Sequence, residues 1–215
     1  MNAELKPVAR QNAIYSEEHE IFRETCHRFY EREVEPHYKR WEKDGTGTPA
    51  ELWRKAGAAG LLGLAIPPEY GGPGGDFLYN IILNEELGKF VGGASVGAAI
   101  TTDVMTNILV EHGTHQQKLR WCPGILAGDV IQCLGLTEPG SGSDVSGIQA
   151  RARRDGDHWV LNGNKCYMSS GSKANLVYFV AKTDDDVKKG RGTMTAFLVD
   201  AKTPGVKLRR MDTIG

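Results

Sequence analysis

A glycine-rich stretch, LGLTEPGSGS at residues 134–143, marks the point in the chain where the sequence pattern changes. Its apolar start is typical of a β-strand, and Gly140 and Gly142 permit the positive φ and close backbone approach of a sharp turn. Thr137, Ser141 and Ser143 are expected to offer hydroxyls beside exposed N–H groups of this turn, and such a loop can hold a phosphate or the polar edge of a ring. Because glycine, proline and serine are ordinary turn residues, a surface turn remains the better interpretation of these residues alone.

The residues before this stretch follow the 3.6-residue apolar period of helices. Helices are predicted to begin at four capping signals, which are Ser16, the Thr48-Pro49-Ala50-Glu51 box, Asp76 and the Thr114-His115-Gln116-Gln117 box. A further helix is predicted from Ser95 to Val110. Pro36 ends the first helix, and its predicted buried stripe consists of Ile21, Phe22, Thr25, Cys26 and Phe29. Residues 1–128 are therefore predicted to form an all-α domain.

The residues after Gly128 follow the pattern of short strands, in which β-branched and aromatic runs alternate with turn residues. A polar loop is predicted at 183–192, and strands are predicted at residues 148–154, 158–161, 165–170, 176–181, 194–199 and 206–209. The predicted fold class is α+β, with an all-α domain at 1–128 and an incomplete, barrel-like all-β domain at 129–215. Since the last strand would lie bare at the chain end, where sheet edges are normally protected, the pattern predicts a truncated chain.

The composition argues against several classes of function. The 26 Lys and Arg residues balance 27 Asp and Glu residues, so the chain has no bulk charge to attract nucleic acid or an anionic membrane. Its four cysteines are scattered without a C-x-x-C pair, which favours reduced core thiols over a metal site. Residues 1–11 resemble neither a secretory signal nor a transit peptide, so we expect a cytoplasmic protein, or a mitochondrial-matrix protein if a targeting segment has been removed.

Several motifs at matching separations carry a family resemblance. Around the glycine-rich stretch they are Leu136–Asp144, Leu161–Lys165 and Tyr167–Gly171. Upstream, the same pattern continues at Gly60–Gly63, Pro68–Gly72 and Glu85–Leu87. Together these motifs resemble the acyl-CoA dehydrogenase family over residues 16–215, with its long-chain branch the nearest in sequence.

The resemblance implies a fold and an activity. Family members have an N-terminal helical domain, a middle β domain and a C-terminal four-helix domain, and this chain is expected to lack the last of these. They oxidise acyl-CoA thioesters to 2-enoyl thioesters with FAD and pass the electrons to an electron-transfer flavoprotein. They usually form homotetramers through their C-terminal helices, so a homo-oligomer is expected only of the full-length family member.

The resemblance also assigns cofactor-binding residues to the glycine-rich stretch. Thr137 and the backbone of Leu134, Gly135 and Leu136 would contact the pyrimidine edge of the flavin ring. A flavin that accepts hydride gains electron density at this edge, so hydrogen-bond donors there stabilise its reduced form. Ser143 would bind the phosphates of the cofactor and border the acyl-CoA substrate.

A second segment is assigned to the flavin ring by the same resemblance. Ser169 would lie near N5 of the flavin and stands where many relatives have threonine. Tyr167 would pack on the ring face, where tryptophan or phenylalanine is usual, and Met168 would contribute its backbone. Gly190 and Arg191 would lie near the CoA.

No catalytic residue is expected among these 215 residues. The family's catalytic base is a glutamate of the C-terminal domain, which removes the α-proton of the substrate. Glu138 adjoins Thr137 on an extended backbone, so it should face the opposite side and serve in an ion pair or a cap. Glu85 and Glu86 are expected on the exposed face of a helix.

Two alternatives to the dehydrogenase remain open. A flavin oxidase or monooxygenase would keep the fold and change the oxidant or substrate, and the reactivity of its reduced flavin with oxygen would distinguish it. A non-catalytic remnant would bind a nucleotide-like ligand or a partner subunit through its exposed faces. Such a remnant would not bleach bound flavin when an acyl-CoA is added.

Overall fold

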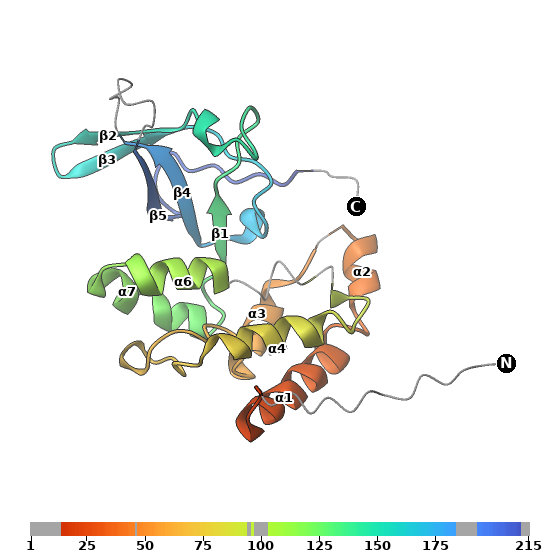
Figure 1. Ribbon diagram of the computed structural model, residues 1–215. Helices are drawn as coiled ribbons and strands as arrows, with labels where there is room; N and C mark the ends of the chain where they lie inside the picture. The colour runs from red at the N-terminus through yellow and green to blue at the C-terminus, as the bar shows by residue number, and fades with distance from the viewer. Residues whose placement is uncertain (1–13, 46, 94–95, 97–102, 184–192, 212–215) are drawn as a thin grey trace.

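The computed structural model describes residues 14–45, 47–93, 96, 103–183 and 193–211. Figure 1 shows a layer of helices, with a β-sheet above it that strand β1 joins to this layer. The described part of the chain contains no helix that is both long and apolar enough to cross a membrane. The predicted order of helices first and strands second is confirmed.

Helix α1 (Glu17–Glu33) begins where its capping signal predicts, because the Ser16 hydroxyl accepts a hydrogen bond from the His19 amide at 3.3 Å. Helix α4 (Phe77–Leu87) packs against it and begins at Asp76, whose carboxylate accepts from the Leu78 amide at 2.9 Å. The predicted buried stripe of α1 is partly wrong. Ile21 is 62% exposed and Thr25 only half-buried, and the buried residues of α1 are His19, Cys26, Phe29 and Tyr30.

The remaining helices follow their predicted signals only in part. Helix α7 (His115–Leu126) has the predicted capping box, in which Thr114 and Gln117 exchange hydrogen bonds of 2.8 and 3.2 Å. Helix α3 (Ala50–Ala58) begins at Pro49 without a side-chain cap, so its predicted capping box is wrong. The short helices α2 (Tyr38–Lys43) and η1 (Pro68–Tyr70) had no predicted counterpart. Of the helix predicted from Ser95 to Val110, the structure describes α6 (Asp103–His112), and residues 95 and 97–102 lie outside the described part.

The strands form a mixed, open sheet. They are β1 (Gln132–Gly135), β2 (Arg151–Asp155), β3 (His158–Asn162), β4 (Leu176–Lys182) and β5 (Met194–Asp200). Central strand β4 pairs in parallel with β1 and along its whole length antiparallel with β5, while β2 and β3 form a hairpin. Strand β2 meets β4 through one residue pair, Arg151 and Lys182, so the described sheet is incomplete as a barrel.

Two predicted strands are absent from the described sheet. Residues 165–170 form a turn-rich segment because Tyr167 and Ser170 have positive φ angles of 54° and 59°, which a strand cannot contain. Residues 206–209 run outside the sheet without a ladder partner among the described strands. Both stretches have the composition of strands but lack the pairing.

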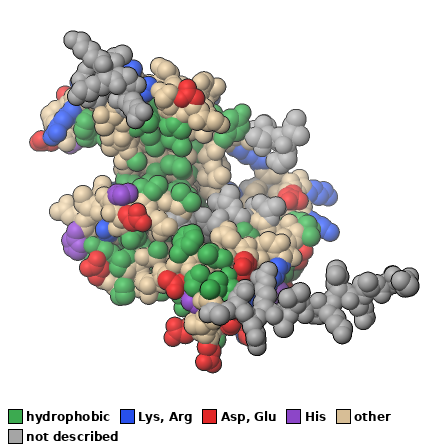
Figure 2. Space-filling model, viewed as in Figure 1, with side chains coloured by type: hydrophobic (Ala, Val, Ile, Leu, Met, Phe, Trp, Pro, Cys, Tyr) green, Lys and Arg blue, Asp and Glu red, His purple; other side chains and the backbone are tan. Residues whose placement is uncertain are grey.

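A buried polar chain connects the sheet to the helices. Gln132 on β1 is 1% exposed, and its amide accepts from the Tyr178 hydroxyl of β4 at 2.8 Å and donates to the Thr106 hydroxyl of α6 at 3.0 Å. Around this chain, an apolar cluster includes Leu109 of α6 and Trp121 of α7. Figure 2 shows hydrophobic side chains gathered across the middle of the molecule, where the sheet and the helical layer meet.

Glu86 does not lie on an exposed helix face as expected, since it is only 1% exposed. Its carboxylate accepts from Arg23 and His27 of α1, both at 3.1 Å, and from Lys89 at 2.5 Å. Burial alone would raise the pKa of Glu86, but these three hydrogen bonds outweigh it and hold the pKa below the ordinary value of 4.5. The network therefore stabilises the α1–α4 contact only while Glu86 is ionised.

Acid is expected to remove this contribution. A carboxyl whose pKa is lowered on folding stabilises the protein above its unfolded pKa of 4.5, and this stabilisation is lost as the pH falls through the lower folded value. The free energy of unfolding, measured by urea denaturation at a series of pH values, should therefore fall less steeply below pH 4.5 in Glu86→Gln than in the unsubstituted protein. Equal slopes in the two proteins would show that Glu86 does not contribute.

Candidate functional site

The glycine-rich stretch forms a tight turn at the end of β1. Glu138 and Ser141 exchange backbone hydrogen bonds of 2.9 and 3.1 Å, which leaves Pro139 and Gly140 exposed at its tip. Neither Gly140 nor Gly142 has the positive φ that glycine permits. A Cβ at either glycine would meet nothing within 4 Å, so the turn leaves open space beside its backbone.

The serines of this turn have different environments. Ser141 is buried, and its hydroxyl donates to the carbonyl oxygen of Asp144 at 2.5 Å. Asp144 then caps the short helix η2 (Val145–Gly147) by accepting from the Ser146 amide at 3.1 Å. Ser143 is exposed and can reach a ligand, as its predicted role requires.

Beneath the turn lies a buried ion pair. The Lys165 ammonium group donates to Glu138 Oε1 at 2.8 Å, and the two side chains are 2% and 6% exposed. Glu138 also accepts from the backbone amides of Gln149 and Ala150, at 2.6 and 2.9 Å. Burial alone would raise the pKa of Glu138, but these three donors outweigh it and hold the pKa below its ordinary value. The predicted structural ion pair of Glu138 is confirmed.

The segment after Lys165 is held against the turn in an unusual conformation. The Cys166 amide donates to the carbonyl oxygen of Thr137 at 2.9 Å, which brings the two predicted cofactor-binding segments together. Tyr167 and Ser170 are the non-glycine residues with positive φ in the described structure, and they flank Met168 and Ser169. Such conformations are costly for bulky residues and cluster at functional sites.

The side chains of this segment point in different directions. Tyr167 is 70% exposed and Ser169 is also exposed, so a ring face and a hydroxyl are both open to a ligand. Met168 was expected to be a strand residue, which is wrong, because its carbonyl accepts from the Gly171 amide at 2.9 Å in a turn. Its half-buried side chain packs against Cys133 and Val177.

Family models match both halves of this sequence. The model described as the acyl-CoA dehydrogenase N-terminal domain matches residues 16–129, and the one described as the middle domain matches residues 133–215. The chain belongs to the acyl-CoA dehydrogenase family. The resemblance carried by the sequence motifs is confirmed.

Individual acyl-CoA dehydrogenases are similar in sequence and structure. The mitochondrial long-chain specific acyl-CoA dehydrogenase of Mus musculus is 36% identical over 94% of this chain and 47% of its own length. The crystal structure of an acyl-CoA dehydrogenase from Geobacillus kaustophilus matches with a TM-score of 0.81 and 38% identity, over 89% of this chain and 50% of that one. This chain spans about half the length of the curated relatives that it matches.

Two other solved structures with a flavin or a flavoprotein in their descriptions are also similar. A glutaryl-CoA dehydrogenase from Mycobacterium smegmatis, solved in complex with FADH2, matches with a TM-score of 0.79 and 30% identity over 91% of this chain and 48% of that one. A chain described as an electron transferring flavoprotein of Acidaminococcus fermentans matches with a TM-score of 0.78 and 30% identity, over 89% and 50%.

The structure brings only some of the family's site residues to one cavity. Tyr167, Met168 and Ser169 line a cavity of about 750 Å³ together with residues 207–211. Residues 134–143 do not line it and are joined to it through the hydrogen bond between Cys166 and Thr137. The predicted substrate-binding residues Gly190 and Arg191 lie outside the described residues.

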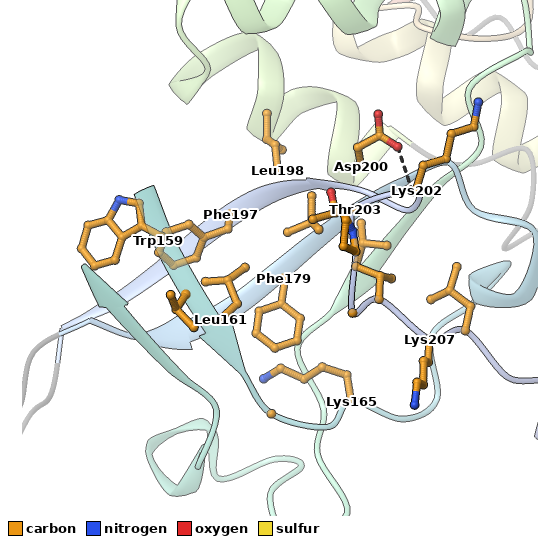
Figure 3. Close-up of a pocket in the computed structure, with 18 of the residues that line it drawn as sticks. Trp159, Leu161, Lys165, Phe179, Phe197, Leu198, Asp200, Lys202, Thr203 and Lys207 are labelled. Atoms are coloured by element: carbon orange, nitrogen blue, oxygen red, sulfur yellow. Dashed lines mark hydrogen bonds between the residues drawn. The ribbon is translucent and has the colours of Figure 1, made fainter. Parts of the chain in front are cut away.

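Sequence reasoning missed a second hollow, of about 880 Å³, on the sheet. Figure 3 shows Trp159, Leu161, Phe179 and Phe197 from strands β3, β4 and β5 around it, with Lys165 at its lower side. Trp159 is 42% exposed and contacts Phe197 edge-on, with ring centroids 5.4 Å apart. The aromatic residues of these strands indicate an apolar face. They do not indicate that the sheet is open and leaves this face exposed.

Proposed function

We propose that this protein is an FAD-dependent acyl-CoA dehydrogenase, in which residues 134–143 and 167–169 supply one face of the flavin site. The observation that carries the proposal is the backbone of Tyr167 and Ser170, whose positive φ angles hold the Tyr167 ring and the Ser169 hydroxyl toward solvent beside the Thr137 turn. A flat ring with a polar edge needs this combination of an aromatic surface and nearby donors. The FADH2 complex of the M. smegmatis relative supports the choice of cofactor.

Different residues would bind different parts of FAD. The Thr137 hydroxyl and the backbone of Leu134–Leu136 would bind the polar edge of the ring, and Ser169 would donate near N5. Ser143 would serve the phosphates, since it is exposed beside N–H groups of the turn. Bound FAD would supply the hydride acceptor for α,β-desaturation of an acyl-CoA thioester. We propose an electron-transfer flavoprotein as the acceptor of the electrons.

Neither Glu138 nor Glu86 suits the role of the base. A general base needs a pKa near the working pH and a free lone pair directed at the substrate. Glu138 has a lowered pKa and three hydrogen-bond donors, and Glu86 is bound in the same way inside the helical layer. We therefore propose that residues 1–215 hold the cofactor and border the substrate without removing the α-proton.

Anaerobic titration of the FAD-loaded protein with octanoyl-CoA and palmitoyl-CoA tests this function. We expect a saturable shift of the visible flavin band, because the thioester would lie against the ring, and we expect no bleaching by residues 1–215 alone. Bleaching would place the base among these residues. A flavin band that does not respond to either thioester would exclude an acyl-CoA site, and rapid reaction of the photoreduced flavin with oxygen would favour an oxidase or monooxygenase.

Ser169 offers a direct test of the flavin contact. Removing its hydroxyl in Ser169→Ala deletes a donor worth about 0.5–1.5 kcal/mol, so FAD should bind roughly threefold to tenfold more weakly. Ser169→Thr keeps the hydroxyl and should bind FAD nearly as the unsubstituted protein does. Quenching of flavin fluorescence measures both. If alanine binds as tightly as threonine, Ser169 does not contact the cofactor.

A further inference from the structure

The Lys165 side chain holds the backbone of the turn that precedes it in sequence. Its ammonium group donates to the carbonyl oxygen of Leu136 at 3.1 Å, in addition to its ion pair with Glu138. The next residue, Cys166, donates its amide to the carbonyl oxygen of Thr137. Two consecutive carbonyl groups of the turn are thus held by two consecutive residues of the second segment.

This contact fixes the direction of a hydrogen-bond donor. The described structure has no cis peptide bond, and in a planar trans peptide the C=O and the N–H point in opposite directions. Because the Leu136 carbonyl points to Lys165, the N–H of Thr137 in the same peptide points away from Lys165. We propose that Lys165 is a positioning residue that aims the Thr137 N–H at the edge of the flavin, an inference that rests on the proposed function.

The surroundings of Lys165 are built to hold its chain in place. Its ammonium group lies 5.3 Å from the centre of the Phe179 ring, and Figure 3 shows the lysine chain running below that ring. On its other side, a Cβ at Gly135 would come within 3.2 Å of Lys165 Cγ. Gly135 therefore leaves the space that the lysine occupies, and a larger residue there would displace it.

Glu138 holds the ammonium group of Lys165, whereas the Leu136 carbonyl is held by Lys165 itself. Glu138 is itself fixed by the amides of Gln149 and Ala150, just before strand β2, so it holds Lys165 from a rigid element. Two substitutions can therefore separate the effect of the ion pair on protein stability from the effect of Lys165 on the Leu136 carbonyl. Glu138→Gln weakens the ion pair and leaves the Leu136 contact of Lys165, whereas Lys165→Met removes both contacts while keeping a chain of similar length.

The comparison of these two variants tests the proposal. FAD should bind to Lys165→Met about tenfold more weakly than to the unsubstituted protein, since one donor to the flavin edge is misdirected, and the visible flavin band should shift. Glu138→Gln should weaken FAD binding less than Lys165→Met does, because it keeps the contact of Lys165 with Leu136, although both variants lose thermal stability. Equal FAD affinity and equal spectra in the two variants would leave Lys165 a structural role alone and overturn the proposal.

A second measurement does not depend on the cofactor. In the protein without FAD, the amide ¹H and ¹⁵N shifts of Thr137 should change more in Lys165→Met, which loses the Leu136 contact, than in Glu138→Gln, which keeps it. Unchanged Thr137 shifts in Lys165→Met would contradict the positioning role. The Thr137 shifts could also change in Lys165→Met while the unsubstituted protein binds no FAD. Lys165 would then still orient the peptide between Leu136 and Thr137, but the flavin site, and with it the role that we propose for Lys165, would be refuted.

Discussion

Replacing Glu138 with alanine is expected to lower the free energy of unfolding by about 3–5 kcal/mol, the cost of leaving one member of a buried ion pair alone. The Lys165 ammonium group would remain 2% exposed without its carboxylate, and the amides of Gln149 and Ala150 would lose their acceptor. Chemical denaturation with urea, followed by tryptophan fluorescence, would measure the loss.

The ion pair between Glu33 and Lys55 is a matched control. Its N–O distance is 2.8 Å, the same as in the pair of Glu138 and Lys165, but its side chains are 15% and 46% exposed. Water solvates a surface charge that has lost its partner, so Glu33→Ala should cost less than about 1 kcal/mol. Similar losses in the two variants would mean that burial is not what makes Glu138 important.

Replacing Gly128 with alanine is expected to destabilise the protein by more than about 3 kcal/mol. Gly128 has a φ of +73°, and a Cβ there would lie 2.1 Å from the carbonyl oxygen of Trp53 in α3. Because backbone atoms form the obstacle, α3 and the connection to β1 would have to move apart. The thermal midpoint of Gly128→Ala, measured by circular dichroism, should fall accordingly.

Gly60 separates the two causes of this loss. Its φ of +72° matches that of Gly128, but a Cβ there would meet nothing within 4 Å. Gly60→Ala should therefore cost only the conformational term of about 1–2 kcal/mol. If the two alanine variants lose the same stability, the close approach of Gly128 to Trp53 does not constrain the fold.

Signals confined to a few neighbouring residues made most of the helices predictable. Ser16, Asp76 and Thr114 cap their helices as expected, because a capping hydrogen bond joins residues two or three positions apart. The box at Thr48 did not form, and Pro49 takes the N-cap position of α3 without a side-chain hydrogen bond. Thr48 is buried, and its carbonyl oxygen accepts from Lys173 at 2.5 Å, a partner 125 residues away.

The sequence did not predict which charged residues are buried or which residues from distant segments pair with them. Its sequence context predicts a surface position for Glu86, but Arg23 and His27 of another helix bind its carboxylate in the interior. The role of Glu138 in an ion pair could be expected, but its partner Lys165, 27 positions away, could not be chosen among the lysines. Strand-like composition at 165–170 also gave no warning of the positive φ of Tyr167.

The family motifs in the sequence predicted which residues belong to the candidate site. The family resemblance related Thr137 to Tyr167 and Ser169, and the hydrogen bond from Cys166 to Thr137 gives that relation a physical form. The turn itself carried no such information, since its glycines have ordinary φ angles and its residues suit any surface turn. The contact of Lys165 with the Leu136 carbonyl joins residues 29 positions apart, and no local pattern predicts it.

An equilibrium titration of the purified protein with FAD tests whether residues 134–143 and 167–169 bind the cofactor. We expect saturable quenching of flavin fluorescence with a single FAD per chain, together with weaker binding by Ser169→Ala and Lys165→Met. Quenching that does not saturate, or that is the same in the unsubstituted protein and in both variants, would contradict binding at these residues.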